Sequence, residues 1–261
     1  MINKRLLKNA RQQHSNGFKV SENKLYKFSS NHLLSIYPIN AVCTFIPKNA
    51  CSTLRFSIAI ANGFIRDIKD VQWIHNNNGT FRASQREASL ASYTFVVLRC
   101  PYTRIASCFL DKIVDEIIFF NDELGNKVNF NFYEFLLEIQ AQHPSDREQH
   151  WRNQTDFLHY EKYDDYFSLE LFSEAIASLD AKGFKVSDTR ESIKHGISSL
   201  NNLDGDFSKV KAVEIKKMKE EGSAPNYKSM FSKQEIDLVK DIYKDDINLY
   251  KSHFGESELL F

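Results

Sequence analysis

Two short apolar runs, each followed by a turn with a proline and then by a helical pattern, constrain the fold of this chain most. The first run covers residues 41–46 and precedes a predicted helix at 52–61. The second covers residues 93–98, and after Pro101 the apolar positions recur at helical spacing over 102–119. Buried parallel strands read as continuous apolar runs, and strands that alternate with helices indicate an α/β fold. We therefore predict an α/β domain with a central, mainly parallel sheet flanked by helices.

The remaining elements and the domain boundaries follow from pattern and composition. Further helices are predicted at about 131–141, 166–181, 208–220 and 232–251, and short strands at 71–74 and 156–160. The chain has no internal repeat and no Pro- or Ser-rich linker, so we predict a single domain over 31–261. Residues 1–30 are basic and polar, and we expect them to form a partly ordered N-terminal arm.

Composition excludes several classes of function. The 261 residues include 34 Lys+Arg and 34 Asp+Glu, and 42% are hydrophobic, which excludes a mainly disordered chain. A net charge of zero argues against a nucleic-acid partner bound on a broad basic face, so an anionic ligand needs a local pocket. Since no run of about 18 apolar residues occurs and the N-terminus lacks an apolar signal core, we expect no transmembrane segment, no secretory signal and a cytoplasmic location.

The cysteines give no sign of a metal site. Cys43, Cys51, Cys100 and Cys108 show neither CxxC spacing nor a nearby group of histidines. A structural zinc site needs such clustered ligands. We therefore expect reduced thiols, as is usual in the cytoplasm, and no metal.

The turn after the first predicted strand has the chemistry of a phosphate-binding loop. Its candidate anion-binding residues are Lys48, Asn49, Ala50, Cys51, Ser52 and Thr53. Free N–H groups at a helix N-terminus attract anions, small side chains let the backbone approach, and a lysine adds charge. The turn is not a Walker A sequence, because its glycines are missing and the lysine precedes the loop. The alternative is an ordinary loop in which Ser52 caps the helix and Lys48 is solvated.

The second strand-to-helix turn carries a further pair of anion ligands. Arg99 stands at the strand end, and Ser107 follows eight residues later, in the second turn of the next helix. A guanidinium fork and a hydroxyl so placed are able to converge on one phosphate. In the alternative, Arg99 forms a strand-end salt bridge and Ser107 is a small packing residue.

Taken together, the two turns resemble the two cofactor signatures of the sulfotransferases, specifically the carbohydrate sulfotransferase branch, sulfotransferase family 2. Residues 47–52 match its PKxAC[ST] loop, and residues 98–107 match its [FL]xRxPxxRxxS segment from the arginine onward. Residues 150–154 resemble its HWxPQ segment, and residues 158–164 resemble a strand that ends in [FY]E. In this chain Cys100 stands where the family usually has Asp or Glu, and Asn153 precedes Gln154 in place of the usual residue type.

The resemblance implies a phosphate-loop-like strand-loop-helix and an enzyme that transfers a sulfuryl group from 3′-phosphoadenosine 5′-phosphosulfate (PAPS) to a hydroxyl of a carbohydrate or related acceptor. The first loop then binds the 5′-phosphosulfate, the second segment binds the 3′-phosphate, and no metal is required. Without the membrane anchor of animal members, a soluble, bacterial-type member is implied. A phosphate-loop kinase and a pseudoenzyme that binds adenosine 3′,5′-bisphosphate (PAP) or a glycan remain as alternatives. Neither the acceptor nor the oligomeric state follows from the sequence.

A neutral imidazole suits the general base that such a transfer needs near pH 7. His75, between the two signatures, matches the position of a histidine in carbohydrate sulfotransferases, and the alternative is a strand-end histidine that bonds a backbone carbonyl. His150 is the second candidate, next to Trp151, which is either a sugar platform or a core aromatic. His159 is expected to be structural. The other histidines are expected at the surface: His14, His32, His143, His195 and His253.

Overall fold

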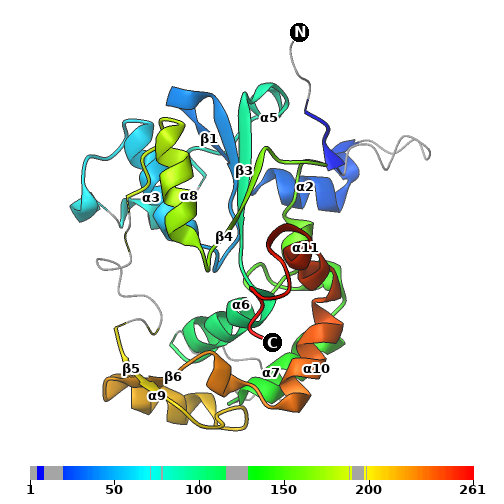
Figure 1. Ribbon diagram of the computed structural model, residues 1–261. Coiled ribbons are helices and arrows are strands. Elements are labelled where there is room, and N and C mark those ends of the chain that lie inside the picture. The colour runs from blue at the N-terminus through cyan, green and yellow to red at the C-terminus, as the bar shows by residue number, and fades with distance from the viewer. Residues whose placement is uncertain are drawn as a thin grey trace. The chain divides into compact units, whose positions relative to one another are not determined.

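The computed structural model describes residues 5–8, 20–70, 72–77, 79–115, 129–187, 189, 197 and 199–261. His14, His195 and the far end of the helix predicted to reach residue 119 lie outside the described residues. The described chain forms two compact units (Figure 1). The first consists of described residues within Met1–Arg99 and Asn153–Ser192, and the second of those within Cys100–Arg152 and Ile193–Phe261. The single domain predicted over 31–261 stays a prediction.

The first unit contains a sheet of four strands in the order in which they occur in the chain. These are β1 (Leu33–Ile36), β2 (Ala41–Thr44), β3 (Tyr93–Leu98) and β4 (Asp165–Ser168). β1 pairs antiparallel with β2, whereas β2 with β3 and β3 with β4 pair in parallel. The mainly parallel sheet confirms the predicted α/β fold, and β2 and β3 lie where the apolar runs placed them.

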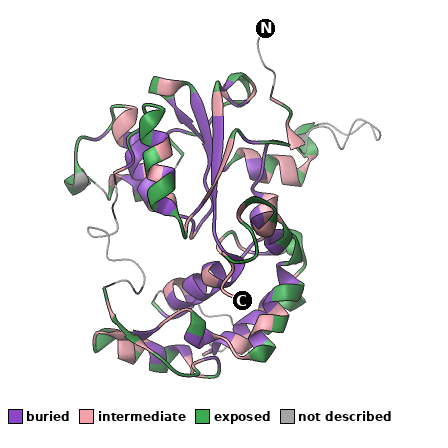
Figure 2. Cartoon of the chain, viewed as in Figure 1, coloured by how far each residue is buried: buried purple, intermediate pink, exposed green. Residues whose placement is uncertain are grey.

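Helices cover the sheet and bury its strands. In Figure 1, α3 (Cys51–Ala61) and α8 (Phe172–Ala181) lie on one face, and Figure 2 shows β1, β2 and β3 mostly buried, whereas β4 is mostly half-buried. Phe95 and Val97 of β3 pack in one apolar cluster with residues of both helices, such as Leu54 and Phe172. Side chains alternate between the two faces of a sheet along each strand. Thr44 of β2 points to the face opposite this cluster, where its hydroxyl lies 2.6 Å from the Tyr163 hydroxyl. The apolar runs are thus buried on both faces, as parallel strands require.

Three local predictions in this unit are wrong. Residues 73–76 form the short helix α4 (Trp73–Asn76), not a strand. Around 156–160 the chain has a 3-10 helix (Gln154–Asp156) and one isolated bridge, Leu7 with Tyr160. The helix predicted at 166–181 begins only at Phe172, because β4 precedes it and pairs with β3 through Asp165 opposite Phe95. These segments are short, and partners distant in the sequence decide their structure.

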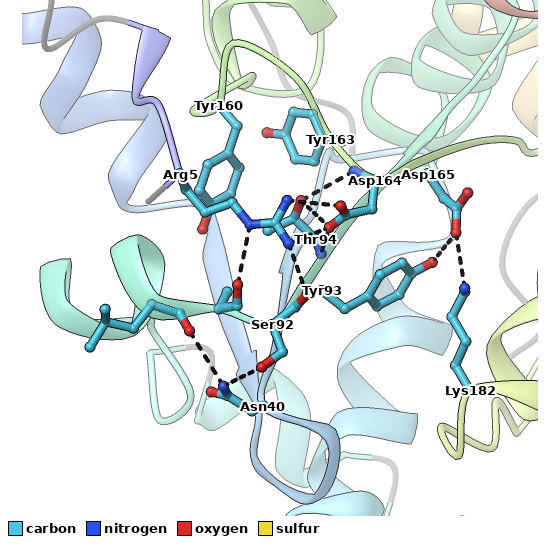
Figure 3. Close-up of polar contacts among 12 residues, drawn as sticks. Arg5, Asn40, Ser92, Tyr93, Thr94, Tyr160, Tyr163, Asp164, Asp165 and Lys182 are labelled. Carbon is cyan, nitrogen blue, oxygen red and sulfur yellow. Dashed lines mark hydrogen bonds and ion pairs between the residues drawn. The ribbon is translucent and has the colours of Figure 1, made fainter. Parts of the chain in front are cut away.

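The N-terminal segment is tied to the sheet. Within the predicted arm, residues 24–30 form α2 (Lys24–Ser30), and residues 5–8 run beside 159–161, where Lys8 N–H donates to the His159 carbonyl. Arg5 donates to Asp164 Oδ1 at 2.8 Å and to the Ser92 carbonyl at 2.9 Å (Figure 3). Asp164 also accepts the Thr94 N–H at 2.7 Å. The start of β3 is therefore held by a charged pair.

The second unit is mainly helical. It contains α6 (Pro101–Cys108), a π-helical turn (Phe109–Ile113), α7 (Phe132–Ala141), α9 (Ala212–Glu220), α10 (Lys233–Ile242), α11 (Lys244–Phe254) and a two-stranded parallel sheet of β5 (Asn201–Leu203) and β6 (Ser223–Pro225). The helix predicted at 232–251 is two helices that meet at Tyr243. Tyr243 itself has non-helical backbone angles, φ −116° and ψ 28°, and its buried hydroxyl donates to the Trp151 carbonyl at 2.6 Å. No helix in the described part of the chain is long and apolar enough to cross a membrane.

Two histidines of the first unit are buried. His159 is structural, as predicted, but it lies outside any strand and its Nδ1 is 2.9 Å from the Ser29 hydroxyl. His32 was predicted at the surface, and this is wrong: it is buried, with Nδ1 2.8 Å from the Phe28 carbonyl. Its ring packs 4.6 Å from the Phe157 ring, centroid to centroid. Burial disfavours the charged imidazolium and lowers the pKa of His159 to about 4.

We expect the buried His159 to make folding stability sensitive to acid. The unfolded state binds a proton near pH 6.5, but the folded state does so only near pH 4, so stability falls as pH drops through this window. Between pH 8 and pH 5 the loss from this group is about 2 kcal/mol. Urea unfolding at both pH values should show that His159→Gln reduces the pH-dependent loss by about this amount, whereas the exposed His143→Gln should not. An unchanged pH dependence in His159→Gln would contradict the assignment.

Candidate functional site

The loop between β2 and α3 has an unusual backbone. Lys48 and Ala50 both adopt the left-handed region, with φ of 70° and 56°. For residues other than glycine this conformation is costly, and it persists only where surrounding structure imposes it. The Leu54 N–H donates to the Ala50 carbonyl and begins the helical bonding, so the amides of Cys51, Ser52 and Thr53 lie at the open N-terminus. The loop therefore presents open amides at the start of a helix, which is the chemistry of anion-binding sites, and it does so without Walker glycines.

The six predicted loop residues are placed differently. Ala50 is the N-cap residue of α3, so the alternative in which Ser52 caps the helix is wrong. Lys48, Cys51 and Ser52 are half-buried. The Thr53 hydroxyl is buried 2.7 Å from the Thr189 hydroxyl. The Thr53 hydroxyl therefore already has a hydrogen-bond partner within the protein.

Asn49 shapes the loop from the inside. It is 1% exposed, and its N–H donates to the Ile46 carbonyl at 3.1 Å. Its side-chain amide donates to the Val97 carbonyl at 2.9 Å and to Gln154 Oε1 at 2.6 Å. The loop after β2 is thereby fastened to the end of β3.

Charged residues follow three neighbouring strands at their carboxyl ends: Lys48 after β2, Arg99 after β3 and Glu170 after β4. Arg99 donates from its guanidinium to the Lys48 carbonyl at 2.9 Å, and its Nε lies 4.0 Å from Glu170 Oε1. The Ser168 hydroxyl donates to Glu170 Oε2 at 3.1 Å. Ligands of open parallel sheets bind at this edge, so these three side chains form the charged part of the candidate site in the first unit.

Sequence reasoning missed Glu170. A strand that ends in a glutamate was predicted at 158–164, but the strand that pairs with β3 is β4, and Glu170 stands two residues beyond its end. Glu161 is instead exposed, and its N–H donates to the Leu6 carbonyl. The available signal for β4 is the aromatic pair Tyr166-Phe167, which favours a strand and precedes the start of α8 at Phe172 by a short turn.

Arg55, in the first turns of α3, was also missed. Its guanidinium carbon lies 4.0 Å from the centre of the Phe45 ring. Burial lowers the pKa of Arg55, and the nearby Cys51 acts in the opposite direction. Arg55 stands four residues after Cys51, a spacing that puts two helical side chains on one face. This spacing was the available signal for a second cation beside the loop.

The second predicted segment continues in the second unit. Ser107 is buried in the second turn of α6. Arg104, which the family pattern also contains, is buried and donates to the carbonyls of Arg152 at 2.7 Å and Gln149 at 3.3 Å. Arg104 is therefore bonded within the protein and holds residues 149–152. The joint role of Arg99 and Ser107 at one phosphate stays a prediction.

His75 lacks the geometry on which its prediction depended. It is exposed on α4, not at a strand end. Trp73 of the same helix packs 6.0 Å from Phe64, just beyond the C-terminal end of α3. Lys48 precedes the opposite end of α3, and a helix of 11 residues is about 16 Å long. The shared carboxyl edge expected for His75 and Lys48 is therefore not found.

His150, in the second unit, has a partner that orients its ring. Its Nδ1 lies 2.9 Å from the Glu148 carboxylate, which also accepts the His150 N–H at 2.7 Å. Burial raises the pKa of Glu148, but the hydrogen bonds and charge of His150 outweigh it and hold that pKa below its usual value. A neutral ring that donates from Nδ1 carries its lone pair on Nε2. The adjacent Trp151 is a core aromatic, buried at 5.7 Å from the Phe135 ring.

The acidic, histidine and cysteine side chains do not gather into a metal site in the part of the chain that the structure describes. Groups of three or more such residues with the required geometry are absent among those residues. Among the cysteines, Cys43, Cys100 and Cys108 are buried, and Cys51 is half-buried.

Comparison with known proteins gives one finding. A search of the curated proteins finds no match. A search of the solved structures finds none either. The model of the sulfotransferase family matches residues 39–253, a range that includes the β2–α3 loop, Arg99, Ser107 and His150. With a match over most of its length, this chain belongs to the sulfotransferase family.

Proposed function

We propose that this sulfotransferase uses PAPS as donor and transfers its sulfuryl group to a hydroxyl of a carbohydrate or related acceptor. The observation that carries the proposal is the left-handed backbone at Lys48 and Ala50, which opens the N-terminus of α3 toward an anion. The lysine belongs to the same loop, and Arg99 contacts that loop directly. A donor with two separate anionic groups suits two cationic turns at one sheet edge.

The chemistry follows from charge and geometry. The acceptor oxygen attacks sulfur in line, the new S–O bond forms as the bond to the 5′-phosphate oxygen breaks, and a sulfate ester and PAP result. Negative charge grows on the leaving oxygen, and Lys48 with the amides of α3 stabilises it there. The acceptor proton passes to a general base.

We assign the base to His150 in preference to His75. A base held by a third group is the usual arrangement in enzymes, and the Glu148 carboxylate 2.9 Å from Nδ1 provides that group. His75 is exposed on α4, near the end of α3 that is remote from Lys48. The carboxylate partner is therefore the observation that favours His150.

Calorimetry with PAP, ATP and AMP tests the donor, and sulfate transfer from PAPS to sugar acceptors tests the reaction. We expect PAP to bind more tightly than AMP or ATP, and transfer to proceed with PAPS. Mg²⁺-dependent turnover of ATP would instead indicate a kinase of the phosphate-loop type. PAP binding without transfer to any hydroxyl acceptor would indicate a pseudoenzyme.

Substitutions at Lys48 and Arg99 should differ in how they affect the transfer rate and the affinity for PAP. We expect Lys48→Met to abolish transfer and to lose only part of the PAP affinity, because the charge matters most as the leaving oxygen becomes negative. Arg99→Ala should weaken PAP strongly, because in the proposed function it removes a cationic phosphate ligand. Steady-state kinetics and calorimetry measure both, with the exposed Arg86→Ala as control. Equal losses of rate and affinity in the two variants would refute the division of roles.

His150 should matter for turnover and not for PAP binding. We expect His150→Gln to lower kcat by about 10²–10⁴-fold, the usual contribution of a positioned base, with PAP affinity close to wild type. Glu148→Gln should lower kcat by a smaller factor, because the ring loses its orienting carboxylate. The control is His75→Gln, which should turn over normally. A large loss in that control and none in His150→Gln would return the base to His75.

Cys51 should report on the phosphate loop. It lies half-buried at the N-terminus of α3, whereas Cys43, Cys100 and Cys108 are buried. We expect iodoacetamide to label Cys51 first and PAP to slow this labelling. Mass spectrometry of the labelled peptides gives the rate at each cysteine, with Cys51→Ser as control. The same Cys51 rate with and without PAP would exclude it from the binding loop.

A further inference from the structure

Gln154 lies at the junction of the two cationic turns. It is 1% exposed and begins the 3-10 helix Gln154–Asp156. Its Oε1 accepts the Arg99 N–H at 3.0 Å, and its Nε2 donates to the Arg99 carbonyl at 2.9 Å. The carboxamide thus bonds both polar backbone groups of one residue, as a neighbouring strand would do.

The same carboxamide also bonds the phosphate loop. Gln154 Oε1 accepts from the Asn49 side chain at 2.6 Å, and Asn49 donates in addition to the Val97 carbonyl. Arg99 adds a further bond to the same loop, because its guanidinium donates to the Lys48 carbonyl at 2.9 Å. The loop after β2 and the end of β3 are therefore joined by bonds that converge on one buried amide.

An amide is required at this position. The Arg99 backbone presents one donor and one acceptor, and Asn49 presents a second donor, so the central group needs to donate and to accept. A hydrocarbon at this position would remove three buried hydrogen bonds at once, at a large free-energy cost. The contacts of Gln154 thus set where Arg99 and the loop stand relative to each other.

We propose that Gln154 is a positioning residue that fixes the spacing of the two cationic turns and thereby determines how much tighter a ligand with two anionic groups binds than a ligand with one. This inference rests on the proposed function, in which PAP carries one phosphate for each turn. A ligand that contacts both turns gains its full affinity only when both are held in place. AMP, which keeps the 5′-phosphate and lacks the 3′-phosphate, depends on one turn and is affected less.

The control is a variant that loses a buried hydrogen bond in the same unit but keeps the contacts between the two turns. Thr44 is buried in β2, and its hydroxyl lies 2.6 Å from the Tyr163 hydroxyl. Thr44→Val removes this buried hydrogen bond on the strand that leads into the phosphate loop. The Thr44 hydroxyl bonds Tyr163 and not Arg99 or Asn49, so the substitution leaves the bonds between the two turns intact.

The experiment compares the dissociation constants of PAP and AMP, by calorimetry, in the wild type, Gln154→Met, Gln154→Asn and Thr44→Val. We expect the preference for PAP over AMP to fall by about tenfold in Gln154→Met, the effect of losing a buried hydrogen bond. Gln154→Asn keeps the amide on a shorter stem and serves if the first variant does not fold. Its preference should also fall, whereas Thr44→Val should keep the wild-type value. Urea unfolding measures the stability of each.

Each outcome has one meaning. If the Gln154 variants weaken PAP and AMP by the same factor, Gln154 is only structural and the inference is wrong. If Thr44→Val lowers the preference as much as they do, general destabilisation is responsible and the inference is wrong again. If the wild type does not prefer PAP to AMP, the proposed donor is wrong, and the inference falls with it. This last result is seen before any variant is made.

Discussion

The parallel pairing of β2 with β3 is the constraint on which the candidate site depends. Ala41 lies opposite Tyr93 and Thr44 opposite Val96, so both strands end at the same edge of the sheet. The pairing of β3 with β4 brings a third strand end to that edge. Without parallel register, the loop that begins at Lys48 and the arginine at the end of β3 would lie at opposite edges. The parallel register brings Arg99 and the loop to one edge, and there Arg99 donates to the Lys48 carbonyl.

How far the sequence predicts the fold depends on how local the signal is. The runs 41–46 and 93–98 are continuous and apolar, and both appear as strands close to their predicted bounds. The helix predicted at 131–141 is found as α7 because a capping box at Asn131 and an apolar stripe define it locally. In contrast, β1 and β4 have only four residues each, and their pairing partners are distant in the sequence. Register with a neighbour, which no local pattern encodes, decides such strands.

The same distinction applies to the site. Lys48 and Arg99 were found because each stands at a strand-to-helix turn that a short motif describes. Glu170 was missed because its strand was misplaced, and Gln154 was noticed only as part of a family segment, since its bonds to Asn49 and Arg99 depend on tertiary structure. His75 was favoured by its position between motifs, but the helix α4 that carries it packs near the far end of α3. Proximity in sequence to a motif is thus weaker evidence than a strand end.

The left-handed backbone at Lys48 and Ala50 has a consequence for the thermodynamics of binding. Glycine-rich phosphate loops reach this conformation easily but sample many others when empty. In this loop Lys48 and Ala50 are not glycines, so fewer backbone conformations are accessible to the loop. The side chain of Asn49, which stands between them, is buried and bonds Val97 and Gln154. For the proposed donor the loop is thus preorganised, and binding of its anionic group would lose little affinity to the conformational entropy of ordering the loop. The free-energy cost of the left-handed backbone is part of the folding free energy, so it does not weaken binding.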